Sequence, residues 1–187
     1  MKLQSLLLAL VMGVCALASS TPVEAQSAYK LEHNARKALR QLYANNEKAR
    51  EIGAQATAVL VFPSIVKAGF FIGGQSGNGV LFSNGEPVGY YNTSSVSYGL
   101  QFGGQTFGYV LFFMNHKALS YLNQSGGWEV GVGPSIVIVD TGAAKSLSST
   151  TLQKDIYAFI FDQKGLMAGI GLQGSKITQY TPSDDDN

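Results

Sequence analysis

The stretch AVLVFPSIVKAGFFIGGQSGNG, residues 58–79, decides the fold class of this chain. Its first apolar run, residues 58–62, has the composition of a β-strand and ends at Pro63, which lacks the N–H group that a sheet ladder needs. A second run, residues 65–72, carries a single cation, Lys67, and leads into a segment rich in glycine. We therefore predict two short strands that are separated by Pro63 and followed by a glycine-rich turn.

Short apolar runs separated by turn signals continue from this stretch almost to the end of the chain. The strongest signal is Asn84-Gly85, because this dipeptide favours the tight turn of a β-hairpin. A second turn is expected at residues 162–165, and a loop or ragged hairpin at residues 142–151. The expected strands are residues 58–62, 65–72, 80–83, 87–91, 94–101, 107–113, 128–132, 134–139, 156–161, 166–172 and 176–180.

The composition agrees with a β-rich protein. Charged residues are 13% of the chain and 22 residues are glycine, many of them inside or at the ends of the expected strands. Glycine weakens a strand unless it permits a bend or a close approach. The prediction is a mainly β fold with an antiparallel, strongly coiled, β-barrel-like sheet of about ten strands, in which residues 128–132 pair with 134–139.

Residues 26–56 form the helical part of the chain. Apolar residues recur there at helical spacing, at Leu31, Ala35, Ala38, Leu39, Leu42, Ala49 and Ile52. Asn46 is expected to cap a second short helix that ends at Gly53. The polar side is basic, so this amphipathic segment either lies on a membrane or docks on the domain with its charges in solvent.

The organisation expected from the sequence is a leader, one domain and a tail. Residues 1–25 have a basic residue, an apolar core and a small-x-small site, which predict a signal peptide cleaved after Ala25 or after Ala18. Residues 26–181 form one domain, with the helical part at 26–56 and the β part at 57–181, and the acidic tail 182–187 is expected to be disordered. The protein is thus expected to be exported to a bacterial periplasm or outer-membrane periphery, and a lipoprotein anchored through Cys15 is the alternative.

We find no pattern for catalysis, for a metal or for a cofactor in the sequence. The two histidines, His33 and His116, lie in different segments without converging carboxylates, which excludes a recognisable zinc or general-base cluster. Residues 74–79 lack the Lys-Ser/Thr ending of a phosphate-binding loop and precede a strand. The basic residues are too sparse for a nucleic-acid groove, so no nucleic-acid partner is expected.

The cations are nevertheless unevenly distributed, because all three arginines lie between residues 36 and 50. This asymmetry suits the surface of an anionic phospholipid membrane. In the strand pattern Lys67 shares a face with Ile65, so it is either a rim lysine with a buried stem or a contact to lipid headgroups. The candidate lipid-binding residues are Arg36, Lys37, Arg40, Lys48, Arg50, Lys67, Lys164 and Lys176.

Several separated blocks of the sequence resemble the SYLF domain family. They are residues 58–67, Gly69-Phe70 with the glycines to Gly79, residues 89–91, 98–101, 126–132, 158–169 and 174–177. The resemblance implies a β-barrel-like domain with N-terminal helices that binds anionic phospholipids and has no enzymatic activity. Some family members also bind actin filaments, but actin is not expected as the partner of an exported protein, and a protein partner is unknown.

Two other functions fit the sequence. A small outer-membrane β-barrel would explain the signal peptide, the aromatic residues and the glycines, although its strands would need about ten residues each. A periplasmic scaffold that binds a protein partner through its sheet is the third hypothesis.

Overall fold

The structure is a computed structural model that describes residues 27–140, 154–165, 172 and 174–182, except the side chains of residues 70, 71, 98–102 and 140. Several expectations lie outside the described residues: those for residues 1–25 with Cys15, the loop 142–151, nearly all of the strand 166–172, and the tail beyond residue 182.

Two helices open the described chain, as the apolar spacing predicts. Helix α2 spans Ala28–Asn45, and α3 spans Glu47–Gly53. The Asn46 side chain accepts a hydrogen bond of 3.0 Å from the Ala49 backbone N–H, which is the expected N-cap of α3. The predicted apolar positions are buried at Leu31, Ala35, Ala38, Leu42, Ala49 and Ile52. No helix in the described ranges is long and apolar enough to cross a bilayer.

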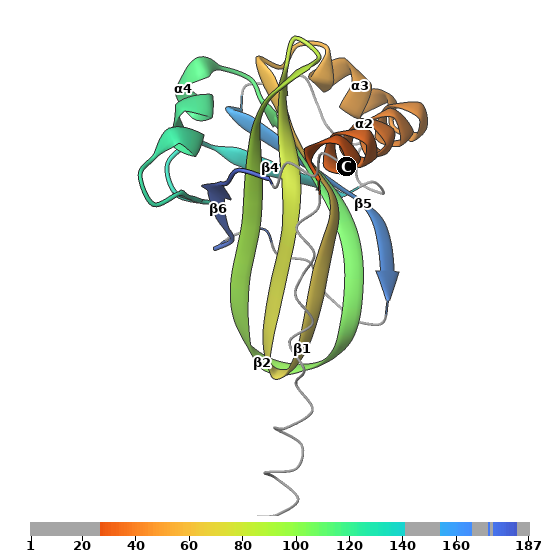
Figure 1. Ribbon diagram of the computed structural model, residues 1–187, viewed down its shortest axis with the longest axis vertical. Coiled ribbons are helices and arrows are strands. Elements are labelled where there is room, and N and C mark those ends of the chain that lie inside the picture. Colours follow the sequence, from red (N-terminus) through yellow and green to blue (C-terminus); the bar gives the residue numbers. More distant parts are fainter. Residues whose placement is uncertain (1–26, 141–153, 166–171, 173, 183–187) are drawn as a thin grey trace, which may run out of the picture.

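One long hairpin dominates the fold (Figure 1). Strand β1 spans Ala58–Ser83 and β2 spans Glu86–Phe113, and they pair antiparallel from Ala58 opposite Phe113 to Ser83 opposite Glu86. Asn84 and Gly85 close the hairpin with φ angles of 52° and 84°, the left-handed conformation that the Asn-Gly signal predicts. The prediction of separate short strands between residues 58 and 113 is therefore wrong, because this part of the chain forms only two long strands.

The hairpin is folded back on itself, so that the two halves of β1 lie side by side (Figure 1). A methyl group added to Gly77 would come within 2.5 Å of the Ser64 carbonyl oxygen, and one on Gly79 within 2.7 Å of the Val61 carbonyl oxygen. Glycine is needed at these two positions because the two halves of β1 approach each other closely there, and not because the chain turns. The turn predicted at residues 73–79 is therefore wrong, because the whole segment is part of strand β1.

Pro63 does not end its strand either. The paired register shifts between Phe62 and Ile65, so Pro63 and Ser64 form a β-bulge inside β1. A bulge leaves a residue unpaired in the ladder, which is where a residue without an N–H group is tolerated. The same solution occurs in β5, Ile156–Gly165, where the expected turn at 162–165 is part of the strand and Asp162 has a φ of 52°.

The remaining strands extend the sheet on both sides of the hairpin. The end of β2 pairs with β5, and β5 pairs in parallel with β4, Ile136–Asp140. The beginning of β2 pairs with β6, Lys176–Gln179, which pairs with β3, Trp128–Glu129. The expected pairing of 128–132 with 134–139 is wrong, and the sheet is mixed, because the long connection from β4 to β5 permits a parallel crossover.

The predicted fold class is confirmed: the chain is mainly β, with a mostly antiparallel, strongly curled sheet and N-terminal helices. Two apolar layers hold it together. One lies on the outer face of the sheet under α2 and α3, and includes Val61, Val80 and Val110. The other lies on the inner face and includes Phe62, Phe107 and Trp128; the short helices α4, His116–Leu119, and η1, Ser120–Asn123, pack against it.

Candidate functional site

Arg36 holds helix α2 on the hairpin. Its guanidinium donates a 2.7 Å hydrogen bond to the Gly85 carbonyl oxygen, lies 3.9 Å from the Glu86 carboxylate and stacks 4.8 Å above the Phe82 ring. All three contacts are with the hairpin turn or the residues next to it. Arg36 is therefore a docking residue of the helix, although the sequence suggested it as a lipid contact.

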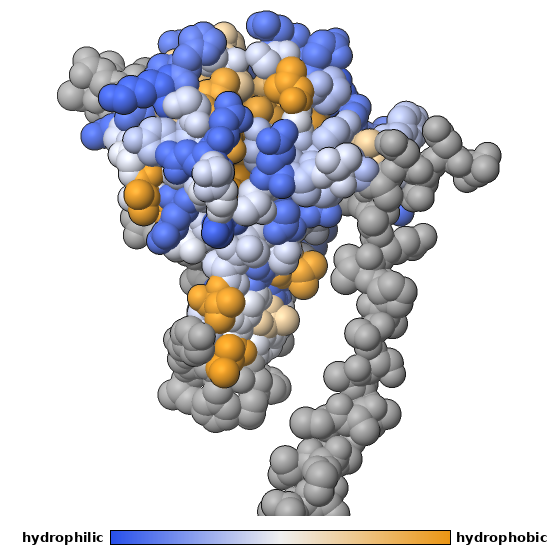
Figure 2. Space-filling model, turned by 60° about the vertical axis from the view of Figure 1, so that its left-hand side comes forward, coloured by the Kyte–Doolittle hydropathy of each residue, from blue (hydrophilic) through white to orange (hydrophobic). Residues whose placement is uncertain are grey.

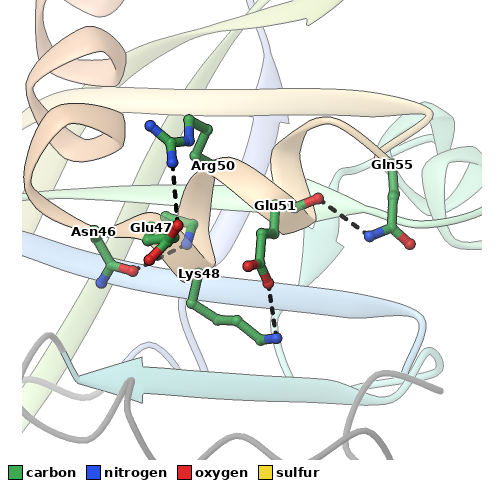
Figure 3. A network of polar contacts seen from close by, with 7 residues as sticks. Asn46, Glu47, Lys48, Arg50, Glu51 and Gln55 are labelled. Carbon is green, nitrogen blue, oxygen red and sulfur yellow. Dashed lines mark hydrogen bonds and ion pairs between the residues drawn. The ribbon is translucent and has the colours of Figure 1, made fainter.

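The two cations of α3 are paired with acids of the same helix (Figure 3). Lys48 Nζ lies 2.9 Å from a carboxylate oxygen of Glu51, and Arg50 lies 3.3 Å from a carboxylate oxygen of Glu47. Such i,i+3 pairs on a helix surface contribute little to stability. They do cancel the local charge, so α3 presents a nearly neutral surface.

Five of the eight predicted residues are exposed cations, and four of these lie outside the Arg50–Glu47 ion pair. Lys37 and Arg40 lie on the outer surface of α2, Lys164 lies near the end of β5, and Lys176 begins β6. None of the four has a hydrogen bond or an ion pair within the part of the chain that the structure describes. Their charges are available to an external anion.

Lys67 lies on the inner face of the sheet, in line with Ile65 and opposite Gln105 of β2. It is half-buried and already interacts within the protein. The buried-stem interpretation therefore fits Lys67 better than an open contact to lipid.

The inner face also carries buried polar side chains, both at this level and on either side of it. The buried Gln75 amide donates a 3.0 Å hydrogen bond to Ser175 Oγ, and the Tyr109 hydroxyl donates a 2.9 Å bond to Thr93 Oγ1. Burial raises the pKa of the Tyr109 hydroxyl. Gln105 is also buried, and its Oε1 atom has no hydrogen-bond partner among the described residues.

A second surface, which the sequence reasoning missed, lies at the end of the hairpin remote from the helices. We call it the distal lobe and define it as β1 residues 66–76 and β2 residues 94–106, which pair with each other. Its outer face exposes Val66 at 57%, Ile72 at 61% and Val96 at 66%. Figure 2 shows apolar side chains on this narrow lower part of the molecule. Alternation in residues 94–101 was visible in the sequence, but not which face is uncovered.

No catalytic constellation emerges from the described residues. His33 on α2 and His116 on α4 are both exposed and lie on separate helices. The described residues contain no group of three or more His, Cys, Asp or Glu side chains that could hold a metal ion. A groove of about 210 Å³ between α2 and the sheet has Lys37, Ser64 and Asp162 on its walls, and its described lining contains no histidine that could activate the Ser64 hydroxyl.

Among the described carboxylates, that of Asp155 accepts the most hydrogen bonds, and it has a structural role. Asp155 accepts hydrogen bonds from the Asn115 amide at 2.9 Å and from the backbone N–H and hydroxyl of Ser135, at 2.9 and 2.8 Å. These bonds, that of Asn115 first, lower the pKa of Asp155. Since Asn115 also caps α4, the carboxylate joins the start of α4 to the segment that precedes β4.

Together these features define a mainly β domain in which two helices cover one half of a folded-back hairpin, and no described helix covers the other half. Its family follows from comparison with known proteins. The family model described as Ysc84, Las17-binding protein actin regulator, matches residues 94–186, and the chain belongs to this family, whose domain is the SYLF domain. The resemblance seen in the sequence is thereby confirmed. A search of curated proteins found no match.

Proposed function

We propose that this protein is an exported, non-catalytic domain that binds the surface of anionic phospholipid membranes. The observation that carries the proposal is the set of four exposed cations without an internal partner in the described structure, Lys37, Arg40, Lys164 and Lys176. Membership of the SYLF family supports a lipid as the partner, and the predicted signal peptide supports a site outside the cytoplasm.

The structure changes the mechanism expected from the sequence. The apolar face of α2 is packed against the sheet, where Leu31 and Ala35 are fully buried, so this helix has no apolar side left to insert into lipid. The helix is thus the docked alternative of the two that the sequence left open. We propose that attraction between these exposed cations and anionic headgroups, at about 1 kcal/mol for each well-placed charge, supplies the binding energy.

The test is co-sedimentation with vesicles of neutral lipid, and with vesicles containing a fraction of anionic lipid, at low and at high salt. The protein is purified from cells that express the full-length sequence, so that any processing of the predicted signal peptide has taken place. A variant in which Lys37, Arg40, Lys164 and Lys176 are all changed to Gln is expected to lose most of the anionic-lipid binding. The wild type is expected to bind anionic vesicles more strongly, and less so at high salt.

The matched control removes one ion pair, Lys48→Gln with Glu51→Gln, and leaves the net charge unchanged; it should bind like the wild type. Equal binding of the wild type to neutral and anionic vesicles would contradict the proposal. Absence of vesicle binding together with a stable protein complex in a pull-down would favour the scaffold hypothesis instead.

A further inference from the structure

The distal lobe reverses the usual polarity of a sheet. On its outer face, which points to solvent, are Val66, Ile72 and Val96, all more than half exposed. On its inner face are the polar side chains of Lys67, Gln75 and Gln105, which are half-buried or buried. A sheet in water normally places polar residues outward and apolar residues inward. A sheet with apolar residues outward is suited to an apolar surrounding.

The outer face of the lobe carries no charged residue. Lys67 is the only ionisable acid or base of residues 66–76 and 94–106 apart from Tyr98, and it lies on the inner face. The sequence of the fold-back segments is rich in large apolar and aromatic residues, namely Phe70, Phe71, Ile72, Tyr98, Leu100 and Phe102. An outer face without charges adds no desolvation cost of ions when it contacts hydrocarbon.

Two lysines lie at the base of the lobe on the same outer face. Lys164 pairs in register with Thr106, on the β5 side, and Lys176 pairs with Ser94, on the β6 side. Directly paired residues share a face of the sheet. The apolar outer surface is therefore bounded, at both of its upper corners, by an exposed cation.

The height of the lobe fits one leaflet of a bilayer. The six residues from Val66 to Phe71 extend about 17 Å from first to last at the usual rise of a strand. The hydrocarbon of one leaflet is about 15 Å thick, half of the usual core of about 30 Å. With the tip at the middle of the bilayer, Lys164 and Lys176 would lie at the level of the headgroups.

We propose that the distal lobe inserts into the hydrocarbon of one leaflet, while Lys164 and Lys176 bind anionic headgroups. This inference rests on the proposed function and specifies the surface and the mode of contact. It differs from adsorption through α2, because the lobe lies at the other end of the hairpin from the helices (Figure 1). A lipid leaflet is favoured over a second copy of the chain because it matches the apolar face and the cationic rim together, whereas a second copy would bring the same two cations to the contact.

The first experiment places a reporter in the lobe. Ile72→Trp is compared with Val88→Trp, since Val88 lies on the same strand face as Val96, is 56% exposed and is outside the lobe. Vesicles containing lipid brominated on the acyl chains quench tryptophan only at hydrocarbon depth. We expect strong quenching of the I72W signal and none for V88W; the native Trp128 is 1% exposed and gives a common background.

The second experiment removes the apolar surface. The triple variant Val66→Ser, Ile72→Ser, Val96→Ser is expected to weaken partitioning into anionic vesicles roughly 100-fold, since each buried aliphatic side chain contributes several-fold or more. Val88→Ser is the control and should bind like the wild type. Circular dichroism checks that the triple variant is folded, and all three positions are exposed, so its stability should be unchanged.

The outcomes separate the two proposals. If the wild type fails to bind any vesicle, the proposed function fails. If it binds, but I72W is not quenched and the triple variant binds normally, membrane binding stands and insertion of the lobe is overturned. If the triple variant instead loses a dimer that sedimentation velocity detects in the wild type without lipid, the lobe contacts a second copy and the inference is overturned as well.

Discussion

The outer face of one hairpin meets two different surroundings. In its upper half Val61, Val80 and Val110 are fully buried beneath α2 and α3. In its lower half, on the same strands and the same face, Val66, Ile72 and Val96 are open to solvent. The strand pattern is the same in both halves, and only the helical cover differs. A valine in such a sheet is therefore a core residue or a surface residue according to what lies above it.

The inner face changes in the opposite sense. Its upper half packs Phe62, Phe107 and Trp128 into an apolar core, and its lower half carries Gln75 and Gln105. The two halves are thus built with opposite polarity along continuous strands. A region that needed only to be stable in water would not gain from this reversal, which indicates that the lower half is adapted to a partner.

The largest expected effect compares two valines of β1. Val61→Asp places an unpaired carboxylate beneath α2 and is expected to reduce the free energy of unfolding by about 3–5 kcal/mol, or to prevent folding. Val66→Asp places the same group on the exposed lower half and should change stability by less than about 0.5 kcal/mol. Urea unfolding followed by circular dichroism measures both.

The same pair sharpens the functional contrast. If the lobe inserts into lipid, the well-folded V66D variant should lose vesicle binding. Similar instability of V61D and V66D would show that both halves are covered, and the division of the sheet would be wrong.

The sequence predicted the helices and their buried face well because both depend on local spacing and on side-chain caps such as Asn46. It predicted the fold class and the turn at Asn84-Gly85 for the same reason. It failed on strand length, since Pro63 and the glycines at 73–79 are breakers only in isolation. In the structure, a bulge accommodates the proline, and the neighbouring half of β1 requires the glycines.

The second prediction uses those glycines. Gly79→Ala would bring a methyl group within 2.6 Å of the Phe62 ring and 2.7 Å of the Val61 carbonyl oxygen, so we expect a loss of about 1–3 kcal/mol in the free energy of unfolding. Gly74→Ala, in the distal lobe, has its nearest neighbour at 3.7 Å and should leave stability unchanged or raise it by up to about 1 kcal/mol. Thermal unfolding of the two variants gives the comparison, and equal losses would mean that the halves of β1 are packed alike along their whole length.

The candidate site was predictable only in part. Counting charges found the exposed cations Lys37 and Arg40 of α2, Lys164 of β5 and Lys176 of β6, but it omitted Lys30, and charge alone could not separate Lys37 from Arg36. Both lie on α2, one residue apart, and only the fold places the Arg36 guanidinium next to Gly85, some fifty positions later in the chain. The apolar outer face of the distal lobe could not be identified before the extent of the helical cover was known.

Substitution of Arg36 is expected to give the smallest of the three effects on stability. It tests which contacts hold α2 on the upper half of the hairpin. Arg36→Ala removes the 2.7 Å hydrogen bond to Gly85 and the stacking on Phe82, and its side chain is 39% exposed, so we expect a loss of about 1 kcal/mol in the free energy of unfolding. Lys37→Ala removes the adjacent cation, which has no such contacts, and should change stability by less than about 0.5 kcal/mol.

Hydrogen exchange measured on both variants locates the effect: faster exchange confined to α2 and the outer layer beneath it is expected for R36A. If R36A and K37A weakened vesicle binding equally and neither changed exchange in α2, Arg36 would be a lipid contact, as the sequence suggested, and the cover would be held by its apolar face alone.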